Sequence, residues 1–96
     1  GGPFAIGDRV MGGAKVGAFA DYVALPATSL RRVPEGLSWA AAASLGAAYT
    51  TAWTALVELG QLRAGQTVLV HGASGGVGLA ACDLARALGA RVIAAT

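Results

Sequence analysis

The sequence predicts an α/β fold in which a β-rich first third leads into the start of a parallel sheet. Residues 68–96 contain an apolar run, a glycine-rich loop, a helical pattern and a second apolar run. This order, within about thirty residues, is typical of a βαβ unit with a right-handed crossover. Hydrophobic residues make up 55% of the chain and charged residues 12%, as expected where parallel strands are covered on both faces.

Short apolar runs and turns alternate in the first third of the chain. Gly7-Asp8 predicts a turn, and residues 9–11 predict a short strand. Apolar side chains between positions 19 and 25 predict a second strand, which Pro26 ends. A third strand is expected over residues 30–33.

Two alanine-rich helices are predicted next. Ser38 is a suitable N-cap for a short helix that reaches Ala43. A second helix is expected over residues 48–59, where Gly60 ends it. Residues 37–57 carry no charge and are long enough to span a membrane. Their small residues and Gly46 favour two helices packed closely inside a soluble protein, so no membrane partner is expected.

The βαβ unit begins with the strand Val68-Leu69-Val70. The helix that follows the loop has four apolar residues on one face, at steps of four, three and four: Val77, Ala81, Leu84 and Leu88. Gly89 ends this helix, and residues 92–95 form the second strand. Cys82 lies next to the apolar face and is interpreted as a small core residue. The free edge of the second strand predicts poor solubility in isolation.

The loop Gly72–Gly78 predicts a dinucleotide site. Glycines allow the sharp turn from strand to helix and the close approach of a ligand. The free N–H groups and the positive end of the helix bind a pyrophosphate. The expected donors are backbone N–H groups near Gly75, Gly76 and Val77, assisted by the Ser74 hydroxyl. A tight turn without a ligand is the alternative, which the complete strand-loop-helix-strand context disfavours.

The glycine spacing fits two patterns. Ala73, Gly75 and Gly78 match GxGxxG with alanine at the first position. Gly72, Gly76 and Gly78 match the spacing typical of short-chain dehydrogenases. The Gly-Lys-Ser/Thr of a P-loop ATPase is not present in this loop.

Charge and cysteine content exclude several classes of function. The net charge is +2, and the seven Lys and Arg residues are scattered, so no nucleic-acid partner is expected. One cysteine cannot form a disulfide within the chain, which suits a cytoplasmic protein. Cys82 and His71 are the only residues of their kinds. A zinc site needs about three or four ligands, so no metal is expected.

The chain resembles the medium-chain dehydrogenase/reductase superfamily, and most closely its zinc-independent quinone oxidoreductase branch, the zeta-crystallin type. The motifs that carry the resemblance are Gly7-Asp8-Arg9-Val10, Ala18-Phe19-Ala20-Asp21-Tyr22, Val33-Pro34-Glu35-Gly36-Leu37-Ser38, Ala41-Ala42-Ala43, Thr51-Ala52-Trp53-Thr54-Ala55-Leu56, Gly65-Gln66-Thr67-Val68-Leu69-Val70 and Gly72–Gly78. They cover nearly the whole chain. About seventy residues precede the loop, whereas a short-chain dehydrogenase begins with it.

The resemblance implies two domains and a hydride-transfer reaction. Residues 1–45 would be the C-terminal part of a β-rich, GroES-like catalytic domain. Residues 46–96 would start the doubly wound parallel sheet of a Rossmann domain. The full-length protein, of which this chain is expected to be an internal piece, would be a homodimer. It would transfer hydride from NADPH to a quinone or another electron-poor enone or carbonyl acceptor, with NADH as the alternative cofactor.

The same resemblance implies roles for two further residues. Thr51 would approach the nicotinamide, and Tyr49 would face the same substrate cleft. Aromatic packing between the two alanine-rich helices is the alternative for Tyr49. No residue is a convincing general acid or nucleophile, so the catalytic residues are unknown. Hydride transfer does not require them, because the cofactor carries the chemistry.

Zinc and NAD are both disfavoured by residues that differ from those of relatives. Zinc-dependent relatives carry a four-cysteine lobe where this chain has residues 12–17, and a catalytic-zinc cysteine where it has Ala47. An acid that selects NAD is expected about twenty residues after the fingerprint, which is near Ala95 and Thr96 when counted from Gly75 and just past Thr96 when counted from Gly78. No Asp or Glu lies between Asp83 and Thr96, which favours NADP at the visible positions. Two other functions stay open: an enoyl-reductase domain of a polyketide or fatty-acid synthase, and a nucleotide-binding protein without turnover.

Overall fold

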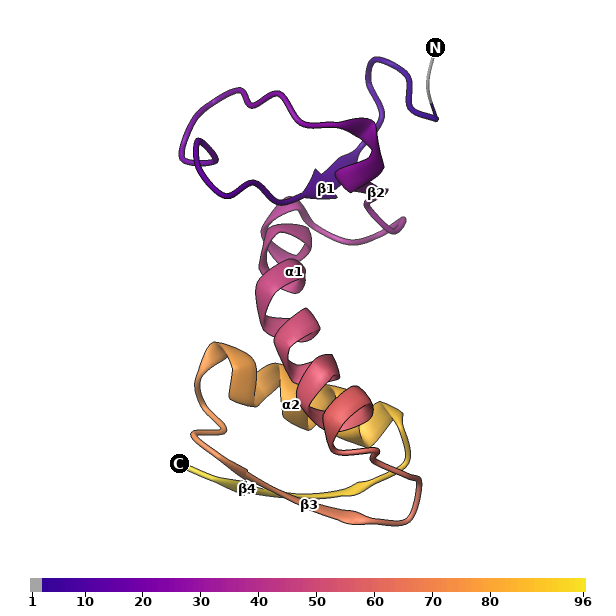
Figure 1. Ribbon diagram of the computed structural model, residues 1–96, viewed down its shortest axis with the longest axis vertical. Coiled ribbons are helices and arrows are strands. Elements are labelled where there is room, and N and C mark those ends of the chain that lie inside the picture. Colours follow the sequence, from indigo (N-terminus) through magenta and orange to yellow (C-terminus); the bar gives the residue numbers. More distant parts are fainter. Residues whose placement is uncertain (1–2) are drawn as a thin grey trace. The chain divides into compact units, whose positions relative to one another are not determined.

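The computed structural model describes residues 3–96 (Figure 1). In chain order the elements are β1 (Val10–Gly12), a 3-10 turn (Ala27–Ser29), β2 (Leu30–Arg32), α1 (Trp39–Trp53), a π-helical segment (Thr54–Leu59), β3 (Thr67–His71), α2 (Gly76–Ala87) and β4 (Arg91–Ala95). The chain divides into two compact units, one up to Gly46 and one from Ala47 to Thr96. Helix α1 contributes residues to both units.

The first unit contains one antiparallel strand pair. β1 pairs with β2, with Met11 opposite Arg31, which confirms the first and third predicted strands. The strand predicted over residues 19–25 is wrong, because the structure has no regular element there. A strand needs a neighbour for its N–H and C=O groups, and no strand within residues 3–96 pairs with this segment. Its apolar side chains Phe19 and Tyr22 are exposed.

Two arginines connect the strands of the first unit to its loops. Arg9 donates to the Leu37 carbonyl oxygen at 2.8 Å, and its guanidinium lies 4.2 Å from the centre of the Trp39 ring. Arg32 pairs with Asp8 at 3.1 Å. Few side chains of this unit are buried, Val33 and Ala42 among them. These directional contacts therefore supplement a small apolar core.

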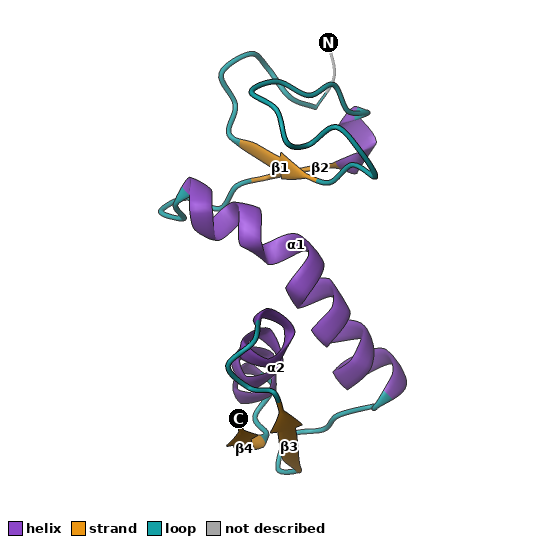
Figure 2. Ribbon diagram, turned by 90° about the vertical axis from the view of Figure 1, so that its left-hand side faces the viewer, coloured by secondary structure: helices purple, strands orange, loops and turns teal. Residues whose placement is uncertain are grey.

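Helix α1 is continuous where two helices were predicted (Figure 2). Ser38 caps it as expected, since the Ala41 N–H donates to Ser38 Oγ at 3.1 Å. Gly46 does not interrupt it. One glycine costs a helix about 1 kcal/mol relative to alanine, and the alanines around it compensate. Within residues 3–96, no helix combines the length and hydrophobicity needed to cross a bilayer.

The helix widens before it ends. Beyond Trp53, residues Thr54–Leu59 form a π-helical segment. The Gly60 N–H donates to the Ala55 carbonyl oxygen, five residues earlier, at 2.9 Å. Gly60 therefore ends the helical run, as predicted. The next residue, Gln61, has a φ of 50°, a conformation that L-residues other than Asn and Asp rarely adopt.

The second unit is the predicted βαβ unit. β3 and β4 pair in parallel, with Val68 opposite Val92, and α2 connects them across one face of the pair (Figure 1). Val70, Ala73 and Cys82 form the buried cluster between helix and strands, which confirms the core role of Cys82. The parallel pair and its helical crossover have the order expected of the start of a Rossmann sheet.

The buried positions of α2 differ from the predicted face. Ala80, Cys82 and Ala85 are its buried residues, whereas Val77 is 45% exposed. Small side chains allow a helix to approach its neighbours closely, so the alanines occupy positions where larger side chains would not fit. The spacing of apolar residues alone does not show which of the adjacent apolar positions of α2 are buried.

A matched pair of glycine substitutions tests this description. Gly89 follows α2 with a φ of 84°, and a Cβ there would lie 3.1 Å from Ala64 Cβ. We expect Gly89→Ala to lower the free energy of unfolding by about 1–2 kcal/mol. Gly46→Ala should raise it by about 0.5–1 kcal/mol, because α1 has open space there. Urea denaturation of the full-length protein measures both, and equal effects would contradict the helix boundaries.

Candidate functional site

The glycine-rich loop is tied to both strands of the parallel pair. Gly72 follows the last residue of β3 and has a φ of 66°, which glycine adopts without strain. The Gly75 N–H donates to the Gly72 carbonyl oxygen at 3.0 Å and closes the turn. The Ala73 N–H donates to the Ala95 carbonyl oxygen, at the end of β4, at 3.0 Å. The loop is therefore held by main-chain bonds that do not depend on side-chain identity.

Three glycines of the loop have different surroundings. A Cβ on Gly78 would overlap the Gly72 carbonyl oxygen and lie 2.8 Å from Ala73 Cα. A Cβ on Gly75 would lie 3.4 Å from the Gly72 carbonyl oxygen, and one on Gly76 would have no neighbouring atom within 4 Å. Gly78 is thus required for packing, whereas Gly76 leaves open space at the helix N-terminus.

The first turn of α2 presents unpaired backbone donors. The first intrahelical bond is donated by Leu79 to the Gly75 carbonyl oxygen at 2.8 Å. The N–H groups of Gly76, Val77 and Gly78 precede it and have no intrahelical acceptor. Gly75 was predicted among the donors, but its N–H is already used within the loop. The free donors therefore begin one residue later than the sequence suggested.

The electrostatics of the loop come from the backbone. Ser74 is exposed, and no hydrogen bond of its hydroxyl is found among residues 3–96. The first turn of α2 contains no acidic residue. The positive end of this helix is therefore not neutralised by its own carboxylates, and an anion is favoured there.

Metal-binding residues do not gather in the described part of the chain. No group of three or more His, Cys, Asp or Glu side chains forms there. His71 is exposed at the end of β3, directly before the loop. Cys82 is buried in the core under α2. The two residues that could supply nitrogen and sulfur ligands thus lie in different environments.

Thr51 and Tyr49 both lie on α1 but on different faces. Residues two apart on a helix are separated by about 200°. The Tyr49 hydroxyl donates to Asp83 Oδ2 of α2 at 2.7 Å, so this face of α1 is turned toward α2. Thr51 is exposed on another face. The alternative prediction for Tyr49 is aromatic packing between two alanine-rich helices. In the structure its contact is instead a hydrogen bond to α2.

Asp83 is the residue that sequence reasoning missed. Its hydrogen bond raises the pKa of the Tyr49 hydroxyl. In the sequence, Asp83 appears as a polar position off the apolar face of a helix. The partners are 34 positions apart, and no local pattern connects them.

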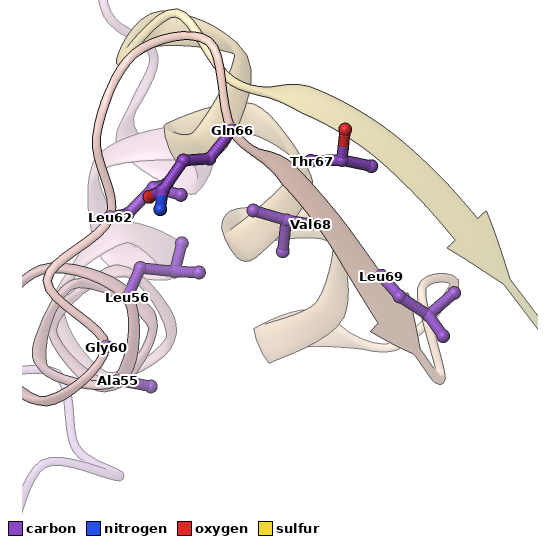
Figure 3. Close-up of a pocket in the computed structure, with 8 residues that line it drawn as sticks. All are labelled: Ala55, Leu56, Gly60, Leu62, Gln66, Thr67, Val68 and Leu69. Atoms are coloured by element: carbon purple, nitrogen blue, oxygen red, sulfur yellow. The ribbon is translucent and has the colours of Figure 1, made fainter.

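A pocket of about 350 Å³ lies elsewhere on the second unit (Figure 3). Leu56 of the π-helical segment and Val68 of β3 lie on its two sides. It borders the first part of β3, whereas the glycine loop follows the last residue of that strand. It therefore contains none of the predicted site residues, which are Thr51, Ser74, Gly75, Gly76, Val77, Gly78 and Tyr49.

Comparison with known sequences identifies relatives of two kinds. No family model matches the chain. It is 43% identical to the quinone oxidoreductase of Homo sapiens over 94% of its own length and 28% of that protein. It is 55% identical to an erythronolide synthase of Saccharopolyspora erythraea over 95% of its length and 2% of that protein. The chain thus spans less than a third of these relatives.

Solved structures agree with the sequence comparison. The quinone oxidoreductase of Thermus thermophilus, whose structure was also determined in complex with NADPH, matches with a TM-score of 0.87 and 42% identity, over 93% of this chain and 30% of that one. An alcohol dehydrogenase superfamily protein from Novosphingobium aromaticivorans matches with a TM-score of 0.91 and 40% identity, over 99% and 31%. The motifs, the βαβ unit and these relatives agree: the chain is homologous to a segment of quinone oxidoreductases and polyketide synthases, and its fold is that of alcohol dehydrogenase superfamily proteins.

Proposed function

We propose that the full-length protein is an NADPH-dependent oxidoreductase that transfers hydride to a quinone or another electron-poor enone or carbonyl compound. The observation that carries this proposal is the loop at the start of α2. It combines unpaired N–H donors, an uncompensated helix N-terminus and open space over Gly76. That combination suits the pyrophosphate of a dinucleotide. The human quinone oxidoreductase supports the reaction class by its similarity.

Each candidate residue has a role in this proposal. The backbone N–H groups of Gly76, Val77 and Gly78 hold the pyrophosphate, and the exposed Ser74 hydroxyl adds a donor. Gly72 and Gly75 shape the turn. Thr51 lies beside the nicotinamide, and the exposed face of α1 that carries it supports this role. When bound, NADPH supplies the hydride, and the protein orients it toward the acceptor and excludes competing reactions.

The end of β4 supports NADPH over NADH. The Ala73–Ala95 bond places this strand end beside the phosphate loop, where an acid that binds the ribose of NAD is expected. The residues here are Ala95 and Thr96, and none of residues 84–96 is acidic. A ribose 2′-phosphate would therefore meet no carboxylate from this strand. We further propose that the protein needs no zinc, acts in the cytoplasm as a homodimer, and divides into domains at residues 45 and 46.

A second function has its own support. The chain is 55% identical to an erythronolide synthase, and its structure matches that of the enoyl reductase CurK with a TM-score of 0.64, 36% identity, and coverage of 69% of this chain and 20% of that one. An enoyl-reductase domain of a polyketide synthase would use the same cofactor site on an enoyl thioester. A nucleotide-binding protein without turnover is the third candidate.

The acceptor distinguishes these functions. We expect the full-length protein to bind NADPH, measured by fluorescence titration, and to oxidise it when a simple quinone is added, measured by absorbance. Oxidation with an enoyl thioester and not with quinones would favour the synthase domain. Binding without oxidation by either acceptor would contradict both enzymatic functions, and absence of binding would contradict the cofactor site.

Two glycine substitutions separate binding from folding. Gly76→Ala adds a methyl group to open space at the helix N-terminus, so we expect unchanged thermal stability and at least tenfold weaker NADPH binding. Gly78→Ala places the methyl group against Gly72, and should cost about 3 kcal/mol or more of folding free energy. Thermal melts and NADPH titration measure both. A Gly76→Ala variant that binds NADPH normally would rule out this loop as the pyrophosphate site.

A charge substitution at the end of β4 tests the choice of nucleotide. Thr96→Asp introduces a carboxylate where the ribose 2′-phosphate would lie, so we expect about tenfold weaker NADPH binding from like-charge repulsion. NADH lacks that phosphate, and its affinity should stay constant or rise. Thr96→Asn is the neutral control of similar shape. Equal losses for the Asp and Asn variants would contradict the electrostatic explanation.

A further inference from the structure

The contact between α1 and α2 consists of a hydrogen-bonded pair next to small buried side chains. The Tyr49 hydroxyl donates to Asp83 Oδ2 at 2.7 Å. Residues three apart share a helix face, so Ala52 lies on the Tyr49 side of α1 and Ala80 on the Asp83 side of α2. Both alanines are 1% exposed. Ala80 lies outside the cluster that packs α2 against the strands. Buried small side chains thus lie on the two helix faces that carry the hydrogen-bonded pair.

The hydrogen bond is solvent-exposed and links one position of α1 to one position of α2. Alanine side chains are nearly symmetric in shape and do not select one rotation of a helix over a neighbouring one. A hydrogen bond to one carboxylate oxygen is directional. Among the side-chain hydrogen bonds of residues 3–96, Tyr49–Asp83 is the one that joins α1 to α2. It is therefore the directional side-chain contact between these two helices.

The chain that follows α1 does not restrict the rotation of this helix in the same way. The π-helical segment Thr54–Leu59 follows directly, and its turns are wider than those of an α-helix. Beyond Gly60 the path to β3 runs through irregular chain. The direction of a side chain on α1 is consequently set by the contact with α2, which carries the glycine loop at its N-terminus.

We propose that Tyr49 and Asp83 are positioning residues that set the direction of Thr51 relative to the phosphate-binding loop. Thr51 follows Tyr49 by two residues and points about 200° away from it, so the rotation that places Tyr49 on Asp83 also fixes Thr51. This inference rests on the proposed function, in which Thr51 lies beside the nicotinamide. Neither Tyr49 nor Asp83 exchanges protons with the substrate. Their effect is on the alignment of the transferred hydride.

The proposal predicts a loss of turnover without a matching loss of cofactor affinity. In the full-length protein, Tyr49→Phe should lower kcat about tenfold. The Kd for NADPH should change by less than about twofold, because the pyrophosphate donors are on α2. Asp83→Ala should behave in the same way. Asp83→Asn keeps an acceptor oxygen for the Tyr49 hydroxyl and should retain a kcat close to that of the wild type.

The double variant and a control make the test specific. Tyr49→Phe combined with Asp83→Ala should lose no more turnover than either single variant, because both remove the same bond. Tyr22→Phe makes the same change at a tyrosine that is 93% exposed and should have no effect. Additive losses, or a kcat for Asp83→Asn as low as that for Asp83→Ala, would overturn the proposal. These two Asp83 variants also decide the question if Tyr49→Phe fails to fold.

The proposed function and this inference fail in different ways. Turnover of the wild-type protein is measured first. A wild-type protein that binds NADPH but oxidises it with no acceptor overturns both, because nothing remains to be aligned. If the wild-type protein is active and Tyr49→Phe has the same kcat, the inference alone is overturned. An equal loss of NADPH affinity and kcat in Tyr49→Phe also overturns it, since the pair would then act on the loop and not on Thr51.

Discussion

The close approach of α2 to the end of β3 is the constraint on which the second unit depends. At Gly78 the helix backbone lies against the Gly72 carbonyl and the Ala73 backbone with no room for a side chain. This contact brings the first turn of α2 directly over the end of a strand. The same contact aims the unpaired N–H groups of the helix at the mouth of the loop. Packing and the proposed pyrophosphate binding therefore share one geometric requirement.

The sequence was sufficient where a structure depends on neighbouring residues. The βαβ unit, the Ser38 cap, the helix end at Gly89 and the core position of Cys82 follow from local patterns. The cap and the helix end depend on hydrogen bonds and propensities within a few residues, and the βαβ unit and the burial of Cys82 follow from the apolar patterns of its strands and helix. These are the interactions that a single sequence encodes most directly.

Two of the errors concern contacts between distant residues, and two concern local geometry. The apolar pattern of residues 19–25 predicts a strand, but a strand forms only with a neighbour. Gly46 predicts a break in α1, but the surrounding alanines keep the helix continuous. The Tyr49–Asp83 bond joins two helices whose sequences contain no complementary signal. In the loop, the engagement of the Gly75 N–H depends on the turn geometry, which the glycine spacing alone does not define.

The bond between the Ala73 N–H and the Ala95 carbonyl oxygen joins the loop to the end of β4 through backbone atoms alone. Every residue type except proline supplies the same N–H, and every residue type supplies the same carbonyl. Side chains at the strand end can consequently vary while the loop keeps its shape. If the loop binds the dinucleotide as proposed, selectivity for the ribose could change in evolution by single substitutions at the strand end, while phosphate binding by the loop backbone is inherited unchanged.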